Sequence, residues 1–278
     1  MSRRVPVRTM HRRARRRRSR RFLVTRLLRY WKAFRRAPAA VQVAIATVAA
    51  LTLWLTVNGL YQVIRKPSEL FFPVSGTLYK TPSETWDQYE PIFRKHSTGV
   101  ISAELLAALA QVEGSGNPIV RTYWRFRWRA EPFEIYRPAS SAVGMYQITN
   151  GTFAQARRYC IHDHVVAEDG PWNAWHSCWF NSLYTRVVPS HAVELTSAYL
   201  HVGVEKAQQR YRIRSATLRQ KQDLATVMHL CGVGAGNTYA RRGFRFRPGQ
   251  RCGDHDARAY LARVHRMTAV FTRLARES

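Results

Sequence analysis

One glutamate, Glu113, lies where an apolar helical run meets a turn sequence. The stretch reads LAQVEGSGNP over residues 109–118, and no other acidic residue occurs between 105 and 130. The unpaired carbonyls at a helix C-terminus carry partial negative charge, and they disfavour an ionised carboxyl as burial does. A carboxyl that keeps its proton near neutral pH can work as a general acid. Gly114 and Gly116 leave space beside it for a bulky substrate.

Three further motifs follow this glutamate along the chain. They are SSAVGMYQI at 140–148, the glycine-rich turn HLCGVGAGN at 229–237, and AYLARV at 259–264. Together with VEGSGNP, their order resembles the lytic transglycosylase family with the soluble-lytic-transglycosylase (SLT, lysozyme-like) domain. That family's pattern is a helix ending in Glu-Ser before an Asn-Pro, then Gly-Ala-x-Gly-Leu-Met-Gln, then Ala-Tyr-Asn-Ala-Gly, then a tyrosine-bearing helix. The resemblance extends over residues 98–270.

The second motif is the most specific part of the resemblance. Ala142, Gly144 and Gln147 match the family pattern, and Met145-Tyr146 stands where Leu-Met is usual. The other motifs depart from it: Gly114 replaces the serine after the glutamate. Ser115 follows one place later, and the third motif has lost its asparagine.

The resemblance implies cleavage of peptidoglycan glycan strands by a mainly α, lysozyme-like domain. Glu113 would protonate the glycosidic oxygen between N-acetylmuramic acid and N-acetylglucosamine. It would then accept the proton of the muramoyl C6 hydroxyl, which closes onto C1 as a 1,6-anhydro end. Tyr260 would direct its hydroxyl at Glu113. The glycan would be bound by Gln147 and the backbone around Met145 and Tyr146, with Ser115 and Gly144 as further contacts. We expect neither a metal nor a cofactor.

Two alternatives remain open for this domain. One carboxylate suffices for the anhydro product, because the nucleophile is already attached to the substrate. A hydrolytic, lysozyme-type muramidase would need a second acid, for which Glu131, Glu134 and Asp169 are available. A non-catalytic peptidoglycan-binding scaffold of an envelope-spanning secretion or conjugation machine is the alternative from another class.

The elements that must position these residues are mainly helical. Apolar spacing predicts helices at 102–113, 191–209, 216–231 and 254–275, with Ser102 and Asp254 as N-caps. The stretch TYWRFRWRAEPFEIY at 122–136 alternates aromatic residues with arginines, which indicates a strand. Such a ribbon would line a groove, touch the membrane, or pack its rings inward.

The N-terminal part of the chain indicates a membrane anchor. Residues 1–36 contain sixteen basic residues and no acidic one, whereas residues 37–64 carry no charge. An uncharged stretch of this length spans a bilayer, and it exceeds the apolar core of a cleaved signal peptide. We therefore predict a basic cytoplasmic arm at 1–36 and a transmembrane helix at 37–64. The arm's Leu23, Leu27, Leu28, Trp31 and Phe34 fit an amphipathic helix on anionic lipid.

By the positive-inside rule, the rest of the chain lies in the periplasm, outside the bacterial inner membrane. We expect a linker at 65–97, rich in Pro, Ser and Thr, and the lysozyme-like SLT domain at 98–278. Four cysteines in an oxidising compartment suggest two disulfides, and we prefer Cys160–Cys178 and Cys231–Cys252 because both close short loops.

The expected partners follow from this placement. They are peptidoglycan strands and the inner membrane, with a secretion or conjugation complex as a further option. The basic arm also permits a membrane-tethered nucleic-acid-binding protein, but we do not expect nucleic acid as a partner, because lipid headgroups next to the anchor explain the arm.

Overall fold

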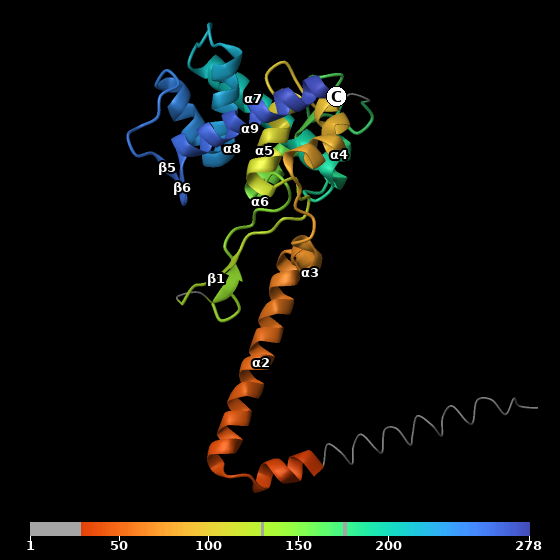
Figure 1. The fold of residues 1–278 in the computed structure, drawn as a ribbon, viewed down its shortest axis with the longest axis vertical. Helices are drawn as coiled ribbons and strands as arrows, with labels where there is room; N and C mark the ends of the chain where they lie inside the picture. Colours follow the sequence, from red (N-terminus) through yellow and green to blue (C-terminus); the bar gives the residue numbers. More distant parts are fainter. Residues whose placement is uncertain (1–28, 129–130, 175–176) are drawn as a thin grey trace, which may run out of the picture. The chain divides into compact units, whose positions relative to one another are not determined.

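The computed structural model describes residues 29–128, 131–174 and 177–278, and in these it is mainly helical. The chain divides into two compact units, residues 1–61 and 62–278. Helix α2, Ala39–Arg65, begins in the first unit and ends in the second (Figure 1).

Helix α2 is long and apolar enough to span a membrane. Its 27 residues give a length of about 40 Å at 1.5 Å per residue, against a hydrocarbon core of about 30 Å. The hydroxyls of Thr52 and Thr56 donate to carbonyls one turn earlier, both at 2.8 Å. These polar groups are therefore satisfied inside the helix and need no water. The observed bounds are close to the expected 37–64.

The basic arm is described only at its end. Residues 29–36 are helical, and the rings of Trp31 and Phe34 lie 5.8 Å apart. Leu23, Leu27 and Leu28, which complete the expected amphipathic face, lie outside the described residues.

The segment expected as a linker is folded. It contains a 3-10 turn, η1, at Pro67–Phe71, the short α3 at Phe72–Ser75, and α4 at Pro82–Lys95. Thr81 and Glu84 form a reciprocal capping box in front of α4. Trp86, Tyr89 and Phe93 of this helix are buried in the core. The linker prediction was wrong because Pro, Ser and Thr there start a helix, as they do at many N-termini.

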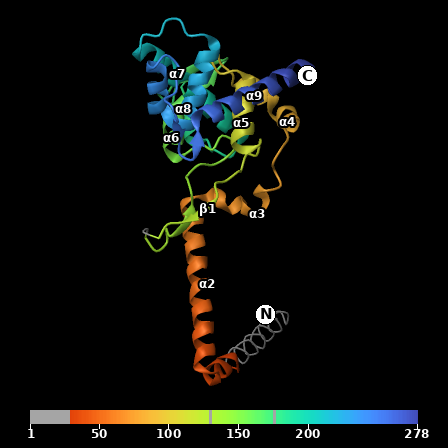
Figure 2. The same ribbon diagram turned by 60° about the vertical axis from the view of Figure 1, so that its left-hand side comes forward.

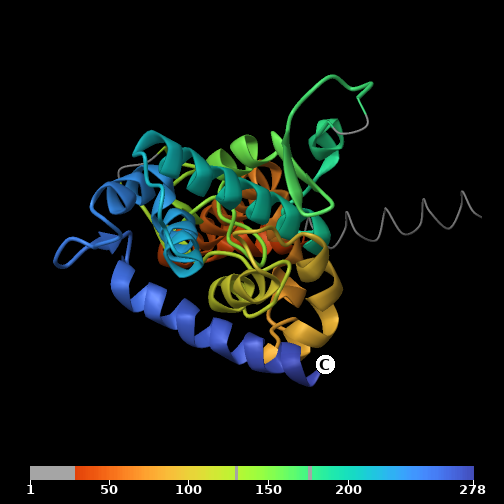
Figure 3. The same ribbon diagram turned by 90° about the horizontal axis from the view of Figure 1, so that it is seen from above.

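Helix α5, Ala103–Gly114, forms the centre of the second unit. Ser102 is its N-cap, as expected, and accepts a hydrogen bond from the backbone of Leu105. Residues 105–110 are all at most 2% exposed, so the helix is buried on every side. Helix α4 and helix α9, Ala257–Glu277, pack against it, and Figure 3 shows α9 running beside α5. A helix that is apolar all round is stable only when enclosed in this way.

The remaining helices surround this centre. They are α6 at Asn150–Ala156, α7 at Pro189–Arg210 and α8 at Leu218–Arg241, with α7 beside α8 (Figure 2). The expected turn at 229–237 is a kink at Gly232, with φ +81°, after which α8 continues. The N-cap of α9 is Asp256 rather than Asp254.

In the described residues, three antiparallel hairpins accompany the helices. Trp124–Phe126 (β1) pairs with Tyr136–Pro138 (β2), Tyr159–His162 (β3) with Val165–Glu168 (β4), and Arg251–Cys252 (β5) with His255–Asp256 (β6). The strand expected over 122–136 is therefore confirmed only for its first part.

Both expected disulfides are present. Cys160–Cys178 joins β3 to the residue before a second 3-10 turn, η2, at Trp179–Leu183. Cys231–Cys252 joins α8, next to its kink at Gly232, to β5. The second bridge therefore ties the approach to α9 to the middle of α8.

We expect Phe93→Ala to lower the free energy of unfolding by about 3–5 kcal/mol, because it leaves a cavity in the core. Phe93 is 0% exposed, whereas Phe71 of η1 is 41% exposed. Phe71→Ala serves as the matched control and should change stability by no more than about 0.5 kcal/mol. Denaturant titration of both variants measures the difference. Equal losses would show that α4 is not part of the core.

Candidate functional site

Glu113 lies in the last turn of α5, as its sequence context predicts. The helix ends because Ser115 adopts the left-handed conformation, with φ +48° and ψ +44°, and its N–H donates to Gln111 O at 2.9 Å. The Glu113 side chain is 18% exposed. It is therefore largely enclosed but still reachable from solvent.

Two side chains from other helices meet the same oxygen of Glu113. Tyr260, in the first turn of α9, donates its hydroxyl to Oε1. Nε2 of His229, in α8 before the kink, lies 3.8 Å from Oε1. Among the described residues, Oε2 has no hydrogen-bond or ion-pair partner, so it is the oxygen left for a substrate.

The protonation of both neighbours follows from their burial. Burial, and then the charge and hydrogen bond of Glu113, raise the pKa of Tyr260 well above its ordinary value. Burial lowers the pKa of His229, although the nearby Glu113 carboxylate opposes that shift. At neutral pH the phenol therefore keeps its proton and the imidazole is neutral. Glu113 therefore accepts a hydrogen bond from a neutral phenol, and the imidazole beside it carries no charge.

The second motif forms a tight turn against the end of α5. Gly144 has φ +79° and Gln147 has φ +47°, and Gln147 N–H donates to Gly144 O at 2.9 Å. Arg186 holds the two sides of this turn together by donating to Ser141 O and Ile148 O, both at 2.8 Å. A Cβ at Gly144 would lie 2.2 Å from Arg186 O. The turn therefore requires glycine at this position.

The side chains of most of the expected glycan-binding residues have structural contacts within the domain. The side chains of Met145 and Tyr146 are 0% exposed and belong to the core. Gln147 uses its amide to donate to Gly144 O at 2.9 Å and Val120 O at 3.2 Å. Ser115 supplies the backbone that ends α5. Gly144 shapes the turn, and of this set Tyr146 and Gln147 also line a cavity.

Tyr146 also positions His229. Its hydroxyl donates to Leu106 O at 3.1 Å, which fixes the ring inside the core. That ring lies edge-on to the imidazole of His229, with the centroids 6.3 Å apart. The second motif therefore contributes to the site indirectly, because its Tyr146 packs against His229.

The departure at Gly114 has a steric cause. A Cβ at this position would lie 2.9 Å from Val120 Cγ1 and 3.0 Å from Met145 Cα. Real side chains do not tolerate such contacts without a shift of the backbone, so a serine does not fit here. A serine at 114 would require the second motif to lie farther from the end of α5.

A cavity of about 210 Å³ opens beside this cluster. Its polar lining includes Gln147, Thr149, Thr196 and His229. Thr196 is 5% exposed, and in the described part of the chain its Oγ1 has no hydrogen-bond partner. Glu113 does not line this cavity, whereas His229 lines it and lies 3.8 Å from Oε1 of Glu113.

The sequence motifs did not single out His229 or Thr196. His229 begins the third motif, but only its burial against Glu113 reveals a role. Thr196 looks like an ordinary core position of α7, and its unpartnered hydroxyl is visible only in three dimensions.

None of the three acids considered for hydrolysis joins this cluster. Glu134 forms ion pairs with Arg65 and Arg137 in the β1–β2 hairpin. Asp169 accepts a hydrogen bond from Gly170 in its own loop, and Glu131 is exposed. The contacts around Glu113 therefore contain no second carboxylate.

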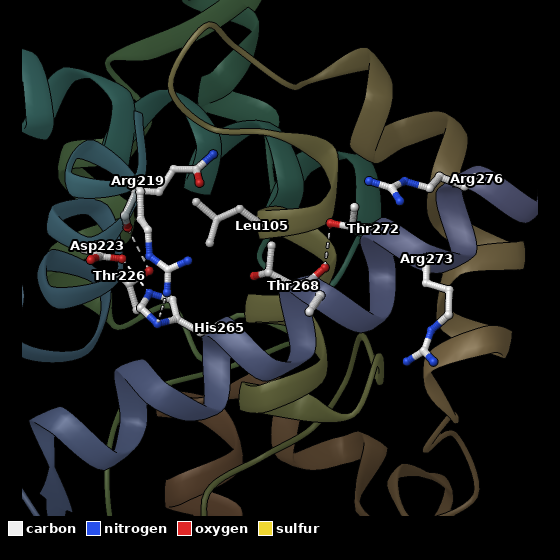
Figure 4. Close-up of a pocket in the computed structure, with 11 residues that line it drawn as sticks. Leu105, Arg219, Asp223, Thr226, His265, Thr268, Thr272, Arg273 and Arg276 are labelled. Atoms are coloured by element: carbon white, nitrogen blue, oxygen red, sulfur yellow. Dashed lines mark hydrogen bonds and ion pairs between the residues drawn. The ribbon is translucent and has the colours of Figure 1, made fainter. Parts of the chain in front are cut away.

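A second groove, of about 520 Å³, lies between α8 and α9 (Figure 4). Asp223 Oδ1 is 2.6 Å from His265 Nε2, and Arg219 Nη2 is 3.1 Å from His265 Nδ1. None of its lining residues belongs to the four motifs, so we separate it from the site at Glu113.

The chain matches no protein-family model, no curated protein and no solved structure. The function of the site is therefore argued from its own residues and geometry.

We expect Gly114→Ser to destabilise the protein by about 1–3 kcal/mol, because the added atoms overpack the contact with Met145. Gly151→Ser is the matched control, since a Cβ at Gly151 in α6 meets nothing within 4 Å. Thermal or urea unfolding of both variants tests this. A stable and more active Gly114→Ser variant would contradict the steric explanation.

His229 should make the protein less stable in acid. Its pKa in the folded state lies below the unfolded value of 6.5. Below pH 6.5 the unfolded chain therefore binds more protons than the folded protein does. The free energy of unfolding decreases as the pH is lowered, until the pH passes below the pKa of His229 in the folded state. His229→Gln should flatten this dependence in urea titrations at pH 7.5 and 5.5. The pKa values of His96 and His191 are also lowered, so a residual dependence remains. Parallel curves for both proteins would contradict a buried neutral His229.

Proposed function

We propose that the protein is a membrane-anchored lytic transglycosylase that cleaves the β-1,4 bond between N-acetylmuramic acid and N-acetylglucosamine in peptidoglycan. The observation that carries the proposal is the arrangement at Glu113. Tyr260 and His229 both meet Oε1, and Oε2 is left for the substrate. A mainly helical domain with this carboxyl at the end of an enclosed helix is consistent with a lysozyme-like SLT domain.

In the first step Oε2 of protonated Glu113 gives its proton to the glycosidic oxygen, and the C1–O bond breaks. Loss of this proton leaves a carboxylate on Glu113, which the Tyr260 hydroxyl stabilises through its hydrogen bond. A neutral His229 matters here. A protonated imidazole at this distance would favour the ionised carboxylate and weaken the acid.

In the second step the same carboxylate accepts the proton of the muramoyl C6 hydroxyl as that oxygen bonds to C1. The product is a 1,6-anhydro end, and Glu113 recovers its proton. No second carboxylate is required, because the nucleophile belongs to the substrate. The absence of one from the described contacts of Glu113 favours this route over hydrolysis, in which a second acid activates water or traps the sugar.

The proposed location is the bacterial inner membrane, with α2 spanning it, the N-terminus in the cytoplasm and the catalytic domain in the periplasm. This orientation is supported by the charge distribution: sixteen basic residues precede α2, and residues 37–64 contain no charged residue. The two disulfides fit an oxidising compartment. Residues 65–278 contain 29 basic and 17 acidic residues, a balance that attracts the carboxylates of peptidoglycan stem peptides.

Digestion of purified sacculi by the full-length protein in detergent tests the proposal, with the released fragments identified by mass spectrometry. Anhydro-muramyl ends are expected, and Glu113→Gln should lower their rate of release about 10²- to 10⁴-fold, as loss of a general acid does. Glu104→Gln, at the other end of α5, is the matched control and should retain activity.

The other products decide between the alternatives. Reducing ends in place of anhydro ends would identify a hydrolytic muramidase. Intact sacculi that still bind the protein would identify a non-catalytic scaffold.

A further inference from the structure

The β1–β2 hairpin is fastened to the residues with which α2 ends. Gln62 Nε2 donates to Phe133 O at 2.7 Å, and Lys66 Nζ donates to Ser140 O at 3.3 Å. Arg65 forms an ion pair with Glu134. All of these residues belong to the second unit, 62–278. The hairpin is therefore held at the point where the apolar helix gives way to the folded domain.

The base of the hairpin is rigid. Glu69 of η1, which is 5% exposed, accepts hydrogen bonds from Arg121 Nη1 and from Trp124 Nε1, both at 2.9 Å. Lys66 Nζ lies 3.1 Å from the other oxygen of Glu69. A buried charge network of this kind costs free energy when it is broken, so it fixes β1 against the end of α2.

The outer part of the hairpin exposes large aromatic side chains. Tyr123 is 64% exposed, Phe126 54%, Trp128 83% and Phe133 41%. The rings of Phe126 and Trp128 stack at 5.7 Å, and Phe126 also stacks on Tyr136 at 4.5 Å. The stacked rings of Phe126, Trp128 and Tyr136 thus form one aromatic group, and an exposed group of this kind marks a surface that meets another apolar phase.

Basic residues alternate with these rings. In the sequence, Arg125 lies between Trp124 and Phe126, and Arg127 lies between Phe126 and Trp128. Arg137 lies on the paired strand. Aromatic residues gather at the membrane–water interface, where the ring meets the acyl boundary and polar groups meet water. Arginine complements the phosphate groups of the same layer.

We propose that the β1–β2 hairpin lies in the lipid headgroup layer of the leaflet at which α2 ends, with its rings toward the acyl chains and the exposed Arg127 on lipid phosphate. This rests on the proposed membrane anchor but not on peptidoglycan cleavage. The contacts of Gln62, Arg65 and Lys66 hold the hairpin to the last residues of α2, so it lies in the layer where that helix leaves the membrane.

Site-directed spin labelling of the full-length protein in nanodiscs containing anionic lipid tests this. All four native cysteines are paired, so an added cysteine is the free thiol to be labelled. Labels replace Trp128, Trp172 as a matched control that is 79% exposed in another loop, and Val48 in α2. Power saturation then compares collisions with oxygen, which enters lipid, and with a nickel chelate, which stays in water.

The label at Val48 should collide mainly with oxygen and the label at Trp172 mainly with nickel. The label at Trp128 should show reduced nickel collisions and raised oxygen collisions relative to Trp172. A label replacing Phe126 repeats the measurement if the Trp128→Cys protein fails to fold.

Each other outcome is decisive. If the Val48 label is accessible to nickel, the membrane anchor itself fails, and the hairpin proposal fails with it. If Val48 lies in lipid but Trp128 is as accessible to nickel as Trp172, the hairpin proposal alone is overturned. If the Trp128 label is aqueous in nanodiscs and becomes immobilised on adding glycan strands, the rings bind glycan instead. Anhydro-end release from sacculi is measured on the same proteins, so loss of catalysis is distinguished from loss of membrane contact.

Discussion

The hydrogen bond from the Tyr260 hydroxyl to Oε1 of Glu113 constrains the rest of the domain, because it offsets part of the cost of burying that carboxyl. This contact requires the start of α9 to meet the end of α5. The Asp256 cap sets where α9 begins, and the Cys231–Cys252 bridge ties the preceding hairpin to the kink in α8. That kink follows His229, the second neighbour of the carboxyl. The site is thus the meeting point of three helices.

Close backbone approach is the second constraint. Gly114 allows the Gly144–Gln147 turn to lie directly against the end of α5, and Gly144 allows that turn to meet Arg186 O. The turn brings Tyr146 into the core, where its ring faces His229. The residues that look like ligands in the sequence therefore build the wall of the site. Thr196 Oγ1 lies beside this wall as a buried hydroxyl without a hydrogen-bond partner among the described residues.

Much of the fold could be predicted from local sequence. The apolar helix near 39–65, the Ser102 cap of α5, and both disulfide pairs follow from composition, capping chemistry and short loop length. Prediction from sequence failed where the same residue types are compatible with two different local structures. Residues 65–97 are rich in Pro, Ser and Thr, which suit either a linker or a helix start, and only the burial of Trp86, Tyr89 and Phe93 decides. Asp254 and Asp256 are both good caps, and the β5–β6 register selects the second.

The sequence by itself determined that Glu113 ends a helix, because an apolar run followed by Gly-Ser-Gly-Asn-Pro has no other stable continuation. It also indicated Tyr260 as a partner, through the order of its motifs. Only the tertiary structure decided which oxygen of Glu113 stays available, that a neutral His229 stands beside it, and that no serine fits at 114. These properties depend on distances between residues far apart in the chain, and burial and close approach have no signature in local spacing.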